Sequence, residues 1–241
     1  MDQRFVTIFN RWKPCSLLSQ YITLKHKKEK QMTNFRSIVL EESGLASAIL
    51  GTGLSFGVTS DYELNENGSL VLTYGKDLSK KTPDEIANRM KIVMEKLAPL
   101  EKGNNKFLEF LVVHMDINAP RYWWSQFDTY RIGVTRLSES TMHTLMKGEL
   151  TRANFSEDTP QRAIDTVNSC IREGAFEAAK ASLPEGFMQR RIVCTNAKAI
   201  RNMYAQRRNH RLKEWKIFWE NVECDAEKYY TFSYALKGLF Y

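Results

Sequence analysis

The sequence predicts an α+β fold in which a small mixed sheet is flanked by long helices. One segment, residues 107–117, is apolar and β-branched enough to form a buried strand, whereas several other segments carry apolar residues at helical spacing. Internal repeats and a regular alternation of strands and helices are both missing, which disfavours a doubly wound parallel sheet. A chain of 241 residues can bury a sizeable core.

The composition narrows the class of protein. Hydrophobic residues make up 43% of the chain and aromatic residues 12%, as in globular proteins. The formal charge of +7 indicates an anionic partner: a nucleic acid, a nucleotide or an acidic surface. No apolar run approaches the roughly 20 residues that cross a bilayer, and no signal-peptide apolar region is present, so we expect no membrane association.

The cysteines are widely scattered and form no CxxC pair, which argues against a zinc site or a disulfide framework. We therefore expect no metal and a reducing, cytoplasmic setting. The four residues are Cys15, Cys170, Cys194 and Cys224.

The N-terminal residues 1–33 are predicted to be a helical or flexible appendage to a single domain spanning residues 34–241. A charged cluster at residues 25–30 precedes Met32, which is an alternative start. The cluster is either a solvated helix end or a nucleic-acid contact. Residues 51–57 are predicted to form a glycine-rich turn, but they lack the GxGxxG and GxxxxGK patterns of phosphate loops.

Two helices are predicted in the middle of the chain. Residues 83–97 begin with Pro83 and place apolar residues at helical spacing, and Pro120 opens a helix over residues 121–127. This second helix carries Tyr122, Trp123 and Trp124. These aromatic side chains either belong to the core or stack on a ligand ring.

Two more helices are predicted in the second half. One runs from Pro160 to the Leu183-Pro184 pair, and the next begins at Thr195-Asn196 and continues past His210 towards Trp219. On the latter, Arg207 continues the apolar face of Ile200 and Met203. An arginine at such a position either extends its charged end to solvent or binds an anion.

The last third of the chain also carries a spaced motif. Asn196-Ala197-Lys198 begins twelve residues after the proline of Leu183-Pro184, and Arg207 follows eleven residues after Asn196. The run closes with His210, Arg211, Glu214 and Trp215. This pattern resembles the C-terminal signature of the flavin-dependent thymidylate synthases, which methylate dUMP with a folate, FAD and a nicotinamide cofactor.

A second block is similar to the same family. The segment from Pro120 through Gln126 to Arg131 resembles the strand-to-helix segment that ends in the family's Arg-His-Arg signature. Only the last basic residue is present, because the first two positions are Thr129 and Tyr130. The resemblance covers roughly residues 84–220. Within the family, the sequence is most similar to a divergent, phage-like branch.

The resemblance implies roles for individual residues. Arg207 is the expected catalytic residue, which grips the pyrimidine of dUMP and polarises it. Lys180 stands where the family has a phosphate-binding arginine; it keeps the charge but not the bidentate geometry. The expected substrate-binding residues are Gln126, Glu139, Ser140, Lys180 and Arg207. The expected cofactor-binding residues are Asn104, Lys106, Arg131, Asn196, Lys198, Asn202, His210 and Arg211.

The resemblance also implies FAD, NADPH and methylenetetrahydrofolate as cofactors, dUMP as substrate, and a homotetramer with flavin bound where subunits meet. One alternative is a divergent member that binds FAD and a nucleotide with altered or lost activity. Another is a basic nucleic-acid-binding protein that uses residues 25–30 and 207–211, although the latter run lies in a helix with apolar residues and matches no known binding motif. A structural or virion protein is a further alternative.

Overall fold

The computed structural model describes residues 34–57, 60–64, 70–74, 83–101 and 103–239. The expected appendage, its charged cluster and Met32 lie outside these residues. The division of the chain at residue 34 therefore stays a prediction.

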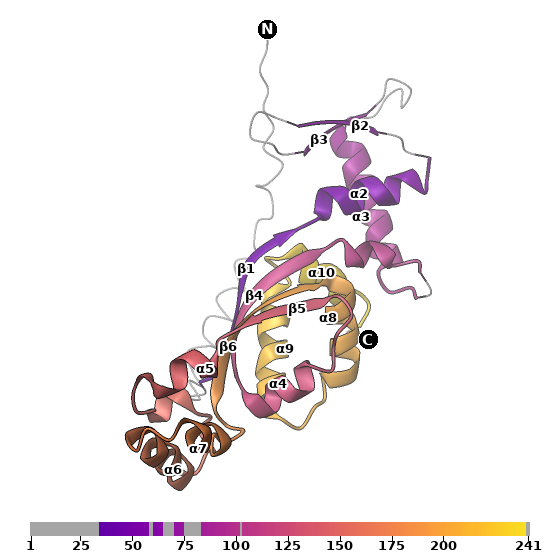
Figure 1. The fold of residues 1–241 in the computed structure, drawn as a ribbon. Coiled ribbons are helices and arrows are strands. Elements are labelled where there is room, and N and C mark those ends of the chain that lie inside the picture. Colours follow the sequence, from indigo (N-terminus) through magenta and orange to yellow (C-terminus); the bar gives the residue numbers. More distant parts are fainter. Residues whose placement is uncertain (1–33, 58–59, 65–69, 75–82, 102, 240–241) are drawn as a thin grey trace. The chain divides into compact units, whose positions relative to one another are not determined.

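The principal sheet has four strands in the order β1-β4-β6-β5, and every pairing is antiparallel (Figure 1). A separate hairpin pairs β2 with β3. The strands are β1 Arg36–Ser43, β2 Ser60–Leu64, β3 Leu70–Tyr74, β4 Val112–Pro120, β5 Val134–Ser138 and β6 Met188–Asn196. The predicted α+β class with a small sheet is confirmed, with antiparallel pairing throughout in place of a mixed sheet.

The helices follow most of the predicted segments. Residues 83–97 and 121–127 are helical over the predicted ranges, as α3 and α4. The α-helices are α2 Leu45–Leu54, α3 Pro83–Leu97, α4 Arg121–Phe127, α5 Thr141–Thr144, α6 Gln161–Arg172, α7 Phe176–Ala181, α8 Ala197–Arg207, α9 Lys213–Asp225 and α10 Tyr230–Leu236. Short 3-10 turns are η1 Lys106–Glu109, η2 Leu145–Lys147 and η3 Arg152–Asn154.

Two predicted long helices are each divided in the structure. The helix expected from residue 160 to Leu183 breaks at Gly174, whose φ of 70° lies in the left-handed region that glycine readily adopts. The helix expected from Asn196 to Trp219 ends at Arg207 and restarts at Lys213. There the Leu212 N–H donates to the His210 ring rather than to a helical carbonyl, which interrupts the backbone ladder.

Two further predictions are corrected. Gly51 and Gly53 belong to α2 rather than to a turn, because burial of Ala48 and Ile49 outweighs the poor helix propensity of glycine, about 1 kcal/mol per residue. The strand expected from Phe107 begins only at Val112. The first apolar residues of that segment form the turn η1 and are nevertheless buried.

The main core lies between one face of the sheet and helices α4, α8 and α9. Trp123 and Trp124 are 0% and 1% exposed, so these two tryptophans are core residues rather than a stacking platform for a ligand. The core also contains Val113, Met115, Ile117 and Val193 from the strands and Ile200, Met203, Trp215 and Phe218 from the helices.

The other face of the sheet carries a row of aligned residues across all four strands. Ile38 pairs with Asp116, Asp116 with Ile192, and Ile192 with Leu137. Arg36 and Arg190 each hold the buried Asp116 carboxylate, at 2.9 and 2.8 Å. The hydrogen bond from Arg190 lowers the pKa of Asp116. The aliphatic ends of the row remain exposed, with Ile38 at 45% and Leu137 at 74%.

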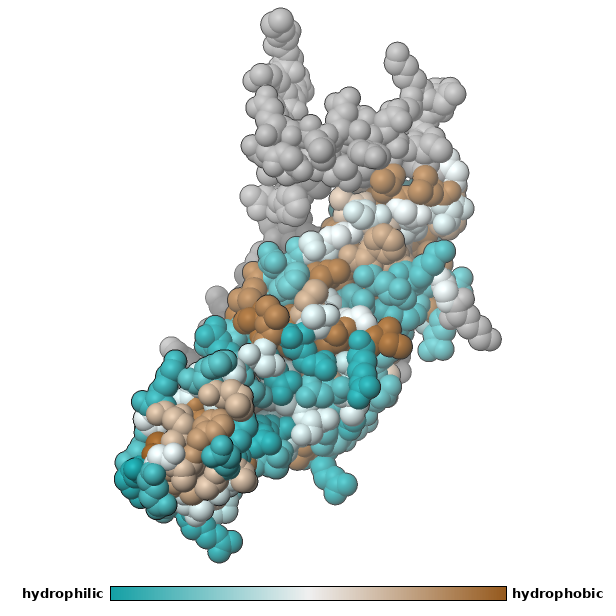
Figure 2. Space-filling view, viewed as in Figure 1, coloured by the Kyte–Doolittle hydropathy of each residue, from teal (hydrophilic) through white to brown (hydrophobic). Residues whose placement is uncertain are grey.

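Hydrophobic surface is also present near α2, where Leu54 and Phe56 are exposed (Figure 2). None of the described helices is both long and apolar enough to cross a membrane.

Candidate functional site

Arg207 lies in a connected group of side chains that we call the Arg207 cluster: Gln126, Tyr130, Arg207 and Trp215. Arg207 Nε donates to the Tyr130 hydroxyl at 3.0 Å, and Nη1 makes a longer contact of 3.4 Å with Gln126 Oε1. Trp215 Nε1 donates to the same oxygen at 3.0 Å. The guanidinium carbon lies 5.9 Å from the centres of both the Tyr130 and the Trp215 rings, within range of cation–π attraction.

Local folding explains how the cluster forms. Ile200 and Met203 anchor α8 in the core, so Arg207, on the same helical face, lies half-buried at the edge of the core. Gln126 comes from α4, and Tyr130 from the turn that follows it. The fully buried Trp215 comes from the first turn of α9. The structure therefore brings together Arg207 and Gln126, two of the expected substrate-binding residues.

Tyr130 is a partner of Arg207 that sequence analysis did not identify. In the sequence, Tyr130 was noted only because it stands where the family signature has a basic residue. In the structure its hydroxyl accepts from Arg207 and is within 3.2 Å of Gln206 Oε1, to which it donates. Trp215 was also missed as a partner, although it stood in the motif, because nothing in its spacing connects it with Gln126.

His210 lies beside the cluster, with its ring centre 6.5 Å from that of Trp215. Its Nδ1 accepts the Leu212 N–H at 3.2 Å, so the proton of the neutral ring is on Nε2. Partial burial and then the positive charges of Arg207 and Arg211 lower the pKa of His210. The folded protein therefore favours a neutral imidazole.

This shift predicts a pH dependence of stability. A histidine whose pKa is lower in the folded state than in the unfolded state stabilises the fold above its unfolded pKa, about 6.5, and that stability is lost as the pH falls through the folded pKa. Protonation also removes the acceptor for Leu212, a loss of about 1 kcal/mol. We expect the free energy of unfolding in urea to fall less between about pH 7 and pH 5 in His210→Asn, which keeps an acceptor but does not titrate. An equal fall in both proteins would contradict this role.

A second group forms around Lys180. Its Nζ donates to the Thr141 hydroxyl, next to Ser140. The Glu139 N–H donates to the Arg190 carbonyl, and Gln189 donates to the Glu139 carbonyl, both at 2.9 Å. The backbone after β5 is thereby fixed next to β6. Lys180, Ser140 and Glu139 thus lie on adjoining elements, whereas no hydrogen bond within the described part of the chain joins them to the Arg207 cluster.

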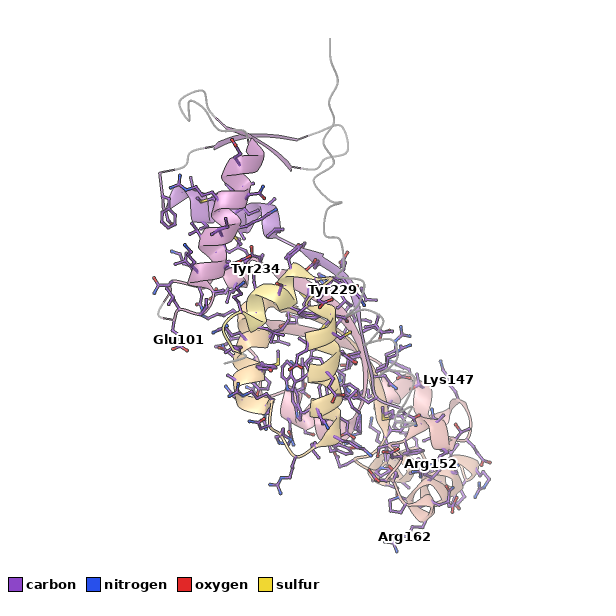
Figure 3. The ribbon with its side chains drawn as sticks, turned by 180° about the vertical axis from the view of Figure 1, so that it is seen from behind. Glu101, Lys147, Arg152, Arg162, Tyr229 and Tyr234 are labelled. Carbon is purple, nitrogen blue, oxygen red and sulfur yellow. The ribbon has the colours of Figure 1, made fainter. Side chains whose placement is uncertain are left out.

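A small separate core supports the Lys180 group. It packs helices α6 and α7 against η2 and the segment that follows η3, in the part of the chain where Figure 3 labels Lys147, Arg152 and Arg162. Its buried members are Leu145, Phe155, Ile164, Val167, Ala179, Leu183 and Phe187.

A third group lies at the start of α8. Asn196 caps this helix, since its Oδ1 accepts the Ala199 N–H at 2.9 Å. A Cβ at Gly133, where φ is 70°, would lie 2.7 Å from Asn196 Nδ2, so only glycine allows this close approach. Lys198 Nζ donates to Asn105 Oδ1. The expected residues Asn104 and Lys106 flank Asn105 in sequence, and Arg131 is two residues before Gly133.

The expected cofactor-binding residues therefore divide between the two ends of α8. Asn196 and Lys198 are at its start, and three more expected residues are within two positions of their neighbours Asn105 and Gly133 in sequence, while His210 and Arg211 follow its end. The helix has 11 residues, about 16 Å. Asn202 lies between them and is exposed. Amides and cations are suitable donors for the phosphates and ring edge of FAD, so the residues fit this cofactor chemically.

Other kinds of site are not apparent in the described part of the chain. Within it, no group of three histidine, cysteine, aspartate or glutamate residues is arranged to hold a metal ion. Three half-buried cysteines, Cys170, Cys194 and Cys224, are free thiols.

Comparison with known proteins shows which solved structures share this fold. No family model matches the chain, and no curated protein matches it in sequence. Among solved structures, thymidylate synthase X (ThyX) from Helicobacter pylori with FAD and dUMP is similar, with 15% identity, a TM-score of 0.60, and coverage of 84% of this chain and 99% of that chain.

A second similar structure is the UMP/dUMP methylase PolB from Streptomyces cacaoi bound with 5-Br dUMP. It has 13% identity and a TM-score of 0.54, and the match covers 84% of this chain and 94% of that chain. A second Helicobacter pylori structure, a flavin-dependent thymidylate synthase complexed with FAD and dUMP, matches at 14% identity with a TM-score of 0.56, over 76% of this chain and 89% of that chain. The chain thus has the fold of ThyX and of the PolB methylase, as its sequence motifs predicted.

Proposed function

We propose that the protein is a flavin-dependent thymidylate synthase that methylates dUMP to dTMP, with methylenetetrahydrofolate as carbon donor and NADPH as hydride source. The observation that carries the proposal is the Arg207 cluster, in which the predicted catalytic arginine lies beside Gln126 in a ThyX-like fold. The similar structures contain FAD and dUMP, or 5-Br dUMP, which supports the same ligands here.

In this proposal the residues of the chain bind and polarise the nucleotide. The Arg207 guanidinium donates hydrogen bonds to a pyrimidine carbonyl and stabilises the negative charge that develops on the ring during methyl transfer. Lys180 neutralises the phosphate, with Ser140 and Glu139 nearby. The group at the start of α8, with His210 and Arg211, holds FAD, which supplies hydride when bound.

A homotetramer is part of the proposal, formed by a single synthase-like domain over residues 34–241. The Lys180 group and the Arg207 cluster lie on different elements, as expected if residues of different subunits complete each site. Exposed aliphatic residues on the open face of the sheet, among them Ile38, Leu40 and Leu137, also favour association.

The second candidate function is a divergent family member that binds FAD and a nucleotide without this turnover. Tyr130, in place of a basic residue of the signature, already engages Arg207 Nε and favours this candidate. A nucleic-acid-binding role for residues 207–211 is less well supported. Arg207 is half-buried in its cluster, and Arg208 donates to the Leu239 carbonyl at 3.1 Å rather than extending freely.

A turnover assay distinguishes these functions. The full chain would be incubated with dUMP, FAD, NADPH and methylenetetrahydrofolate, and the products separated by chromatography. The proposal expects dTMP that depends on each of the four additions. Binding of FAD and dUMP without dTMP would support the second candidate instead.

Lys180→Ala is expected to weaken dUMP binding by about tenfold to a hundredfold, the effect of losing one charged hydrogen bond. The difference from the wild type should shrink as salt is added, because salt screens the interaction of exposed charges. Calorimetric titration at low and high salt would measure the loss of affinity and its salt dependence. It would be done with dUMP and with deoxyuridine, which lacks the phosphate. Lys147→Ala, an exposed lysine in the same part of the chain, is the control (Figure 3). Unchanged dUMP affinity in Lys180→Ala would contradict a phosphate-binding role.

A further inference from the structure

The orientation of the Gln126 amide follows from its two neighbours. The indole N–H of Trp215 can only donate, and so can the guanidinium of Arg207. Both contact the same atom of Gln126, at 3.0 and 3.4 Å. That atom must be the carbonyl oxygen, and the NH₂ group of the amide is the end left for a ligand.

The groups of the cluster that remain available to a ligand are therefore hydrogen-bond donors. The Tyr130 hydroxyl accepts the hydrogen bond from Arg207 Nε, and no described residue accepts one from Nη2. A nucleobase beside this cluster meets the Gln126 NH₂ group and the free guanidinium N–H groups. Uracil presents a carbonyl oxygen at the position where cytosine presents an amino group. Donors facing that amino group would be left unpaired, which is costly in a desolvated site.

We infer that Trp215 is a positioning residue for base recognition: its indole N–H orients the Gln126 amide so that the site selects uracil over cytosine nucleotides. The inference rests on the proposed function, because it assumes that a pyrimidine nucleotide binds at the Arg207 cluster. It adds a specificity role for a residue that does not itself touch the base.

The packing around Trp215 explains why the indole can hold this orientation. The side chain is fully buried and lies against the rings of Trp123, Phe127 and Trp219, with centres 4.8 to 6.3 Å apart. The preceding residue, Glu214, is 3% exposed and accepts a hydrogen bond from the Tyr122 hydroxyl. The first turn of α9 is thereby tied to α4, the helix that carries Gln126. Burial, and then the Glu214 carboxylate, raise the pKa of Tyr122, so its hydroxyl remains a donor.

Trp215→Phe tests the inference because it removes the indole N–H and keeps an aromatic ring. The dissociation constants of dUMP and dCMP would be measured by calorimetry on the full chain with FAD present. The wild type should prefer dUMP by about tenfold to a hundredfold, the usual effect of one mismatched hydrogen-bonding edge. In Trp215→Phe this preference should fall to within about threefold, since the Gln126 oxygen then keeps only the longer 3.4 Å contact with Arg207 and the amide can turn over.

Trp219→Phe is the matched control. Trp219 is 3% exposed and stacks on Trp215, but its Nε1 has no hydrogen-bond partner among the described residues. The same ring change at this position should leave the preference for dUMP as in the wild type. A loss of preference in both variants would overturn the inference, because ring packing alone would then explain it.

Gln126→Glu provides a second test that leaves the buried indole in place. A carboxylate has no donor, so it should weaken dUMP binding more than dCMP binding and move the preference towards cytosine. Wild-type preference retained in Gln126→Glu or in Trp215→Phe would overturn the inference, as would equal wild-type affinity for the two nucleotides. A wild type that binds neither nucleotide, with or without FAD, would overturn the proposed function as well.

Discussion

Replacing Arg207 with alanine will weaken dUMP binding by at least about a hundredfold and leave the fold and FAD binding unchanged. The expected size corresponds to roughly 3 kcal/mol, the loss of more than one charged hydrogen bond. The side chain is only half-buried. After the change Tyr130 still donates to Gln206 and Gln126 still accepts from Trp215, so neither partner is left without a hydrogen bond. Calorimetric titration with dUMP in the presence of FAD measures the loss.

Arg208→Ala is the control for this variant, because it removes the same charge one residue further along. Arg208 is exposed and donates to the Leu239 carbonyl. It should bind dUMP within about twofold of the wild type, since surface substitutions away from a site have small effects. Equal losses in the two variants would mean that positive charge alone, and not the Arg207 cluster, governs binding.

Trp123→Ala is expected to lower the free energy of unfolding by about 3–5 kcal/mol, the range for removing a buried tryptophan or phenylalanine. The indole is fully buried and is in the middle of the aromatic core. Its ring centre lies 4.8 to 5.7 Å from those of Phe35, Trp124, Phe127, Trp215 and Phe218. Urea unfolding followed by circular dichroism measures the change.

The control for this variant is Ile132→Ala, which truncates a side chain that is 94% exposed. We expect it to change the free energy of unfolding by no more than about 0.5 kcal/mol. If Trp123 served chiefly to stack on a flavin ring, its removal would abolish FAD binding and leave stability nearly unchanged. That result would contradict the core assignment.

The helices were easier to predict than the strands because their signals are local. Pro83 is the first residue of α3 and Pro120 immediately precedes α4, and apolar spacing defines the buried faces of these helices. Strand β6 was not predicted, because Arg190 and Arg191 interrupt the apolar pattern of its sequence. Their charges are paired with Asp116 and Asp128, which are distant in sequence and reach them only in the folded sheet.

The candidate site shows the same limit. Arg207 and Gln126 could be selected from the sequence because family motifs carry both, although 81 residues separate them. The partners Tyr130 and Trp215 could not. The bond from Trp215 to Gln126 depends on the break between α8 and α9, where the Leu212 N–H donates to the His210 ring and no helix-breaking residue type marks the position. The bonds of Tyr130 depend on the course of the turn that follows α4.

The measurement that tests the account most directly is the near-ultraviolet and visible absorbance spectrum of the purified full chain, recorded with FAD and then with dUMP. We expect a bound-flavin spectrum that dUMP perturbs in the wild type. In Arg207→Ala we expect the flavin spectrum to remain and its response to dUMP to be lost. The absence of flavin binding in the wild type under every combination of ligands would contradict the account and leave a ThyX-like fold without its cofactor.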